Sequence, residues 1–269
     1  MRKLPFFSII ILVSILLLSF FGNLLYTTSA NDLSVENILL SPSLEHPFGT
    51  DRLGRDLLAR VMQGGQVSFI IGVGSALIAT MVGLMAGATA GFLQGKTDKV
   101  FVIAVDLFLT FPTFFLLLTL VSYVKASVFV LIVVISITGW MTTARLIRSQ
   151  SFEISNQSFI KILKIAKVAR LKILLKYYLP LLAPLFLISF TFGVGGSILA
   201  ESGLSFLGLG ISAPQISWGT ILSEGKEVLD IAWWVSFFPG LMIFLVTLSF
   251  MSLSDYLQAL TNKKEKNTI

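Results

Sequence analysis

Long runs of apolar residues dominate the chain, and short polar segments separate them. A membrane-spanning helix needs about 20 predominantly apolar residues. Six windows fit this length, at residues 4–26, 67–92, 100–124, 128–141 with its flanking residues, 179–200 and 231–253. The pattern predicts an all-α integral membrane protein with six transmembrane helices.

Composition strengthens this prediction. Of the 269 residues, 55% are hydrophobic and only 13% are charged, an excess of apolar side chains over what one soluble core needs. Arg2 and Lys3 precede the first window, as in a signal peptide, but the apolar run is too long and lacks a clear small-residue cleavage site. We expect an uncleaved anchor. With no cysteine and one histidine, His46, neither a disulfide nor a thiolate or multi-histidine metal site is expected.

Basic residues concentrate in alternate connections, which predicts how the helices are oriented. They precede window one, separate windows two and three (Lys96, Lys99) and follow window six (Lys263, Lys264, Lys266). The connection between windows four and five is also strongly basic and has the single acid Glu153. Both termini and these connections are therefore expected in the cytoplasm. The formal net charge of +6 is attributed to orientation rather than to nucleic-acid binding.

The outer segment between windows one and two mixes acids and bases, which predicts a folded, ion-paired surface segment. Within it, "DRLGRDLLARVM" places apolar residues at helical spacing and predicts an interfacial amphipathic helix; these residues are Leu53, Leu57, Leu58 and Val61. His46 precedes Pro47 and is interpreted as a turn residue rather than a ligand.

Window two is rich in Gly, Ala and Ser and includes Gly83 and Gly87. Small residues let helix backbones approach closely in lipid, so this helix is expected to be buried among its neighbours.

Several residues inside the other windows are candidates for the pathway or for helix packing. Asp106 shares window three with Pro112, and a carboxylate in an apolar segment is costly unless it is paired or hydrated. A packing role is favoured for Asp106. Window five holds Gly195 and Gly196 and is either a pathway wall or a kinked packing helix. Glu201 near its outer end faces either cargo or an arginine of the outer segment, and the arginine is favoured.

Residues 90–97 match the nucleotide-binding P-loop pattern only in part. Gly95, Lys96 and Thr97 match its last three positions, but Ala90 occupies the position of the first glycine. The segment also joins two membrane helices, whereas a P-loop joins a strand to a helix. No nucleotide binding through a P-loop is expected.

Four motifs, taken together and in this order, resemble one family. They are "HPFGTDRLGRDLLARVMQGGQVSFIIG" (46–72), "VDLFLTFPTF" (105–114), "AESGLSFLGLGISAPQISWGTILSEG" (200–225) and "SLSDYLQAL" (252–260). The chain is similar to the second permease of the dipeptide, oligopeptide and nickel ABC importers of the bacterial inner membrane.

The resemblance implies a type I importer fold and several partners. These are a homologous second permease, two ATPase subunits that bind ATP and magnesium, and an extracytoplasmic binding protein. This chain would itself bind no cofactor and perform no catalysis. Residues 1–66 would form an anchor with the external segment, 67–260 the transporter domain with a coupling loop at 144–178, and 261–269 a cytoplasmic tail.

Members of this family carry an EAA loop, whose short helix docks on the ATPase. Here Phe159 and Ile160 precede the motif and Leu179-Pro180 closes it. The three motif positions read Lys161, Ile162 and Leu163, and Lys164 follows them as a further coupling candidate. Lys167 replaces a glycine, at a cost of about 1–2 kcal/mol where φ is positive. If the stretch were one helix, Lys161, Lys164, Lys172 and Lys176 would share an arc of roughly 120°. The alternative is a basic helix lying on anionic lipid.

Two other functions were considered, an ATP-independent channel or secondary transporter and a membrane scaffold. No repeat is seen, and only Asp106 and Glu201 are plausible intramembrane carboxylates. For the cargo, "DLFLTFPT" and "LGLGISAP" favour nickel or a nickel chelate, with short peptides as the alternative.

Overall fold

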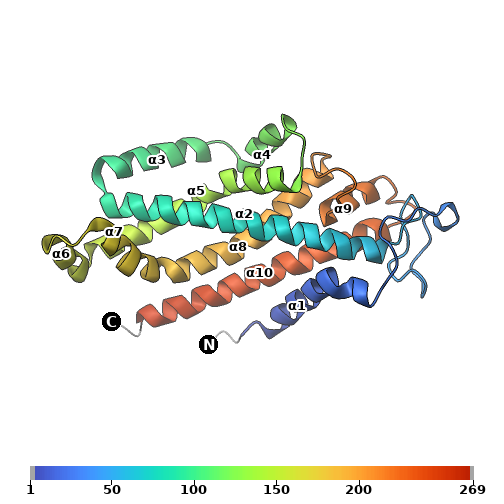
Figure 1. Cartoon of the computed structure of the whole chain (residues 1–269), viewed down its shortest axis with the longest axis horizontal. Helices are drawn as coiled ribbons and strands as arrows, with labels where there is room; N and C mark the ends of the chain where they lie inside the picture. The colour runs from blue at the N-terminus through green and yellow to red at the C-terminus, as the bar shows by residue number, and fades with distance from the viewer. Residues whose placement is uncertain (1–3, 267–269) are drawn as a thin grey trace.

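The computed structural model describes residues 4–266, with side chains through Thr261. Arg2, Lys3 and residues 267–269 lie outside the described residues, as do the side chains of Lys263, Lys264 and Lys266. The described elements are α1 (Phe6–Phe21), η1 (Gly22–Leu24), η2 (Val35–Asn37), α2 (Leu57–Leu93), α3 (Gly95–Leu109), α4 (Thr113–Ser122), α5 (Val128–Asn156), α6 (Ser158–Ile165), α7 (Arg170–Ile173), the π-helix η3 (Leu174–Tyr178), α8 (Leu179–Phe206), α9 (Trp218–Lys226) and α10 (Trp234–Lys266). The long helices run side by side along one axis, with α6 and α7 at one end and the connection after α1 at the other (Figure 1).

Five described helices are long and apolar enough to cross a membrane, and the bent pair α3 and α4 makes a sixth span if it is counted as one. The two halves of that pair meet at an angle of 77°. Proline has no backbone N–H and disfavours helical geometry at the preceding residue, so Pro112 interrupts the span. The prediction of one continuous helix over residues 100–124 was therefore wrong in this respect.

Helix α2 lies against α5 and α8, as the small residues of window two predicted. A Cβ atom added at Gly83 would lie 2.9 Å from the carbonyl oxygen of Trp140 in α5, and one at Gly87 would strike the backbone of Ala144. Close approach of the two backbones thus requires glycine at both positions.

The second span begins ten residues earlier than its apolar window. Asp56 caps α2, because its Oδ1 accepts a hydrogen bond from the backbone N–H of Ala59 at 2.8 Å. Leu57 and Val61 are buried, whereas Leu53 precedes the helix. The predicted interfacial helix is therefore the first part of α2 rather than a separate element.

The outer segment is folded and ion-paired, as predicted. Arg60 is fully buried, with Nη1 3.2 Å from Asp51 Oδ2 and Nη2 2.9 Å from Glu224 Oε2 of α9. Arg55 joins the same two acids. This buried cluster fixes the N-terminal end of α2 against α9.

His46 and Tyr26 meet at the carboxylate that caps α2. His46 Nδ1 lies 2.8 Å from Asp56 Oδ2, and the Tyr26 hydroxyl donates to the same oxygen at 2.7 Å. Burial and this hydrogen bond raise the pKa of Tyr26 to about 12. Within the described part of the chain, no group of three potential ligands that includes His46 could hold a metal ion.

Candidate functional site: the basic turn between α5 and α8

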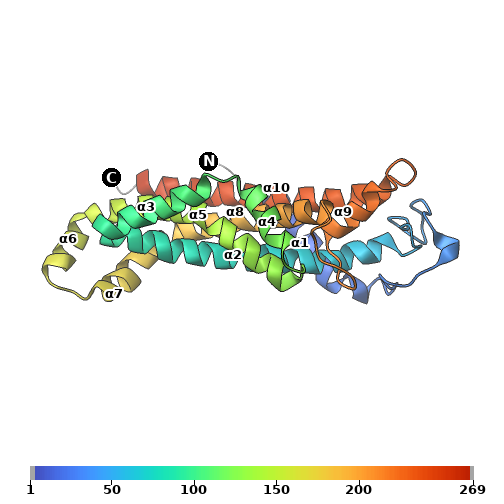
Figure 2. The same ribbon diagram turned by 90° about the horizontal axis from the view of Figure 1, so that it is seen from above.

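The predicted coupling segment projects from one end of the molecule. Helix α6 follows α5 after the extended residue Gln157, and α7 leads back towards α8 (Figure 2). Residues 166–169 separate α6 from α7, so the stretch is not one helix. The four lysines at 161, 164, 172 and 176 therefore do not share one helical face, because the chain turns between Lys164 and Lys172.

One apolar side chain anchors α6 to the bundle. Ile160 is fully buried in a cluster that contains Phe92 of α2, Ile154 of α5, and Ile173 and Tyr178. Since these residues come from four neighbouring elements, a displacement of α6 is resisted by the ends of α2 and α5 and by α7 and the π-helix η3 together.

The rest of the apolar surface of α6 faces outward. Ile162 and Ile165 are 64% and 81% exposed, and Phe159 is also exposed. Lys161 and Lys164 lie among them. An exposed apolar patch bordered by charge is typical of a surface that another molecule covers.

Lys167 adopts the conformation that its replacement of glycine predicted. Its φ is +56°, in the left-handed region. The Val168 N–H donates to the Leu163 carbonyl oxygen at 3.1 Å, and the Lys167 N–H donates to that of Lys164 at 3.1 Å. This pattern of hydrogen bonds closes the C-terminus of a helix and favours glycine at the position of Lys167.

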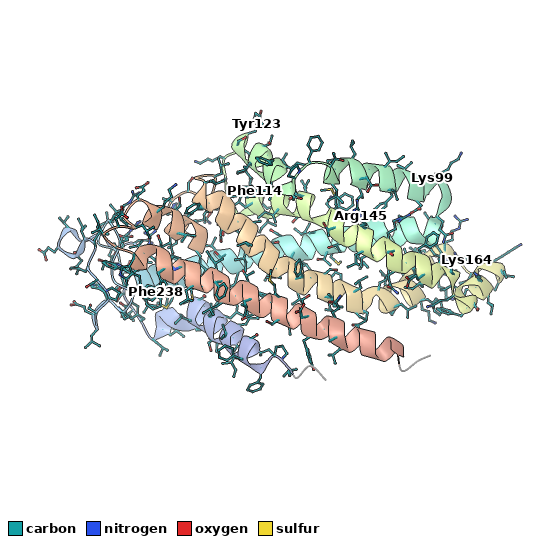
Figure 3. The ribbon with its side chains drawn as sticks, turned by 180° about the vertical axis from the view of Figure 1, so that it is seen from behind. Lys99, Phe114, Tyr123, Arg145, Lys164 and Phe238 are labelled. Atoms are coloured by element: carbon teal, nitrogen blue, oxygen red, sulfur yellow. The ribbon has the colours of Figure 1, made fainter. Side chains whose placement is uncertain are left out.

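The turn encloses a basic cavity of about 470 Å³ lined by Phe92, Lys164, Lys167 and Arg170, among others. The Lys164 ammonium donates to Ser155 Oγ at 2.7 Å and lies 4.9 Å from the centre of the Phe92 ring (Figure 3 labels Lys164). Burial, followed by the charges of Arg170 and Lys161, lowers the pKa of Lys164. No acidic side chain is among the described residues that line this cavity, so it favours a negatively charged partner.

The segment passes directly into the fifth span. The π-helix ends at Tyr178, and Leu179 and Pro180 begin α8 as the motif predicted. Tyr178 packs edge-on against Phe92 at 5.0 Å between ring centres. Movement of the turn is thereby linked to α8 through the backbone and to α2 through a buried aromatic contact.

Asp106 lies away from the turn and pairs with Arg145 of α5 (Figure 3 labels Arg145). A second pair, Asp98 with Arg148, joins the same two helices. Both pairs hold α3 against α5, which supports the packing interpretation of Asp106. The sequence analysis missed Asp98, whose partner is 50 residues away.

Glu201 is fully buried, but no arginine among the described residues contacts it. Its Oε1 accepts hydrogen bonds from Ser205 Oγ and Ser217 Oγ, each at 2.6 Å. The predicted arginine partner was therefore wrong, because the outer arginines pair with Asp51, Glu224 and Glu227. Hydroxyl donors satisfy the carboxylate and tie α8 to the N-terminal end of α9.

The two glycine candidates face different surroundings. A Cβ atom at Gly195 would lie 3.4 Å from the Thr247 carbonyl oxygen and 3.5 Å from Phe250 Cβ, both in α10. A Cβ atom at Gly196 would meet nothing within 4 Å. Gly195 is thus a packing residue, whereas Gly196 borders open space that Thr113, the residue after Pro112, also lines.

Several apolar spans joined by a basic, surface-projecting turn define the class of multi-pass inner-membrane transport components. Residues 79–264 match the family described as binding-protein-dependent transport system inner membrane component, and the chain belongs to this family.

Two similar proteins illustrate the relationship. The chain is 31% identical over 261 residues to the oligopeptide transport system permease protein OppC of Haemophilus influenzae, covering 96% of this chain and 84% of that protein. It is 33% identical over 258 residues to the dipeptide transport system permease protein DppC of Bacillus subtilis, covering 96% of this chain and 81% of that protein.

Proposed function

We propose that this chain is one of two permease subunits in an ATP-driven importer of short peptides. The observation that carries the proposal is α6, which is anchored by buried Ile160 while Phe159, Ile162 and Ile165 remain exposed. In the isolated chain these apolar side chains stay exposed outside the bundle, whereas a docked ATPase would bury them.

Peptide is preferred as cargo because OppC and DppC are named for oligopeptides and dipeptides. The nickel prediction from the motifs gains no support from these relatives. Selection of cargo is expected to lie largely with the extracytoplasmic binding protein.

In the proposed assembly, two ATPase subunits bind ATP and magnesium and lie against α6. A homologous permease forms the other half of the pathway. Both termini of this chain are proposed to face the cytoplasm, as the distribution of basic residues predicts. The C-terminal end of α10 lies towards the same end of the molecule as the basic turn, which supports this orientation (Figure 1). The division into an anchor (1–66), a transporter domain (67–260, with the loop 144–178) and a tail (261–269) stays a prediction, and its first boundary falls inside α2.

The coupling works through rigid packing. ATP-driven closure of the ATPases displaces α6, and the cluster around Ile160 and Tyr178 transmits the displacement to α8. The basic cavity beside Lys164 and Arg170 then requires acidic side chains on the ATPase. Anionic lipid is the second candidate for this surface because it offers the same charge.

Uptake into proteoliposomes tests the function. Vesicles that contain both permeases, the ATPases, MgATP and binding protein are expected to accumulate labelled dipeptide or oligopeptide, and vesicles without the ATPases are not. Uptake that persists without the ATPases would support a channel or secondary transporter. Accumulation of labelled nickel and not peptide would restore the earlier cargo prediction.

A further inference from the structure

A continuous groove follows α8 between its neighbours. One cavity of about 930 Å³ lies between α4, α8 and α10, and another of about 640 Å³ lies between α2, α5, α8 and α10. The two cavities share four lining residues, Thr113, Leu117, Gly196 and Ala200. Figure 3 shows α8 between α5 and α10 along this course. We call the joined cavities the α8 groove.

The lining of the α8 groove becomes more polar along its length but stays largely apolar. The first cavity is bordered chiefly by apolar side chains, such as those of Leu199, Phe206 and Phe244. The second is also bordered by many apolar side chains, but it includes hydroxyl residues such as Thr80, Thr138, Thr142, Thr143, Ser189 and Ser197. Asp255 is the one charged residue among the described residues of that lining.

Two hydroxyl groups of the groove lack partners in the described structure. Ser189 is a lining residue of the second cavity and Thr247 of the first, and their side-chain oxygens are buried behind the lining without a hydrogen bond among the described residues. A buried hydroxyl without a partner is costly, and hydrocarbon tails offer it none. These positions therefore favour water or a polar solute over lipid.

We propose that the α8 groove is the surface of this chain along which the transported peptide passes. Its hydroxyls exchange hydrogen bonds with the backbone amides of the peptide, and its apolar part accommodates side chains. Gly196 lies at the junction of the two parts, where its missing side chain keeps the groove open. The inference rests on the proposed function for the identity of the cargo.

The chemistry of the lining matches a peptide better than a metal ion. A hydroxyl is both donor and acceptor, so it complements an amide N–H or C=O without selecting a particular side chain. Divalent nickel prefers imidazole and carboxylate ligands, and the described lining offers no histidine and only Asp255.

The absence of cysteine from the chain makes a labelling test direct. Single cysteines are introduced as Gly196→Cys and Thr142→Cys, both at exposed positions of the groove lining, with Ser249→Cys as the matched control. Ser249 is buried in α10 and donates to the Leu245 carbonyl oxygen, so its replacement places a thiol inside the packed bundle. The assembled transporter in membranes is treated with a hydrophilic thiol reagent, and the mass shift of this chain alone is followed.

Both groove cysteines are expected to react at least tenfold faster than Ser249→Cys, and transport of saturating peptide is expected to slow their reaction severalfold. If both groove cysteines react no faster than the control cysteine, the proposal is overturned, because the partner permease or lipid then covers the groove. Reaction that is fast but unaffected by peptide would also overturn it, leaving only a hydrated surface.

A size test complements the labelling. Gly196→Val is expected to lower peptide uptake at least tenfold in correctly folded transporter, and Gly196→Ala less. Gly195→Ala, which faces α10 at ordinary contact distance, is expected to stay within twofold of wild type. Equal uptake by Gly196→Val and wild type would contradict the proposal. If the wild-type transporter moves no peptide while the cysteines still react rapidly, the proposed function fails instead.

Discussion

The Lys164 ammonium donates a hydrogen bond to the hydroxyl of Ser155 at 2.7 Å, across the turn between α5 and α6. Lys164 also lies over the ring of Phe92 at the end of α2. A single side chain thus fixes the orientation of the projecting helix relative to two spans. The account of coupling depends on this rigidity.

Ser155→Ala tests that relationship. Loss of a hydrogen bond to a charged group is expected to cost about 1.5–3 kcal/mol in the free energy of unfolding, because the partly buried ammonium loses its partner. Stimulation of ATP hydrolysis by loaded binding protein should fall more than basal hydrolysis. Ser158→Ala, at the exposed start of α6, is the control, and equal effects of the two variants would count against the proposed role.

Lys167→Gly should make the isolated chain more stable. Glycine reaches φ = +56° without the steric cost of a Cβ atom, so a gain of about 0.5–1 kcal/mol is expected from the midpoint of thermal unfolding in detergent. Lys161→Gly, inside α6, should instead lower stability by about 1 kcal/mol. Each substitution removes one positive charge from the same segment. If one raises and the other lowers stability, the loss of charge alone cannot explain both results.

Arg60→Ala should be among the most destabilising substitutions on the outer side. It leaves the buried carboxylate of Asp51 with fewer partners, and breaking a buried ion pair costs about 3–5 kcal/mol. Arg52→Ala removes the same charge from a pair in which both side chains are exposed, and should change stability by about 1 kcal/mol or less. Chemical unfolding of the two variants side by side measures the difference, and similar losses would refute the importance assigned to burial.

The raised pKa of Tyr26 predicts that the protein loses stability at alkaline pH. Its pKa is raised to about 12 in the folded protein against an ordinary value of 10, so folding favours the protonated hydroxyl. The stabilisation is fully present below pH 10 and is lost as the pH rises through 12. Tyr26→Phe, which cannot donate to Asp56, should flatten the pH dependence of unfolding in this window. An unchanged profile would show that other groups control alkaline unfolding.

Hydrophobic pattern alone located the spans, because burial in lipid imposes length and polarity on every crossing helix. It misplaced the start of α2, since Gln63, Gly64, Gly65 and Gln66 interrupt the apolar run without interrupting the helix. The hydrophobic pattern also did not predict that Pro112 divides a span. Hydropathy measures the polarity of side chains and does not include the backbone N–H that proline lacks.

Contacts between distant segments were the least predictable. The sequence suggested that Glu201 needs a partner, but Ser217 supplies one from 16 residues away and Glu224 pairs with Arg60 from 164 residues away. The conformation of Lys167 was predictable from the resemblance, because the family has glycine, the residue that favours positive φ, at this position. The separate surroundings of Gly195 and Gly196 required the packed structure.

Crosslinking of α6 to the ATPase tests the central claim most directly. In the otherwise cysteine-free chain, Ile165→Cys places a thiol on the exposed face of α6, and Ile160→Cys places one in the buried cluster. A short reagent that joins thiols to amines is added to the assembled transporter. The account predicts a crosslink from position 165 to the ATPase and none from position 160. A transporter that hydrolyses ATP and imports peptide while position 165 never crosslinks to the ATPase would contradict it.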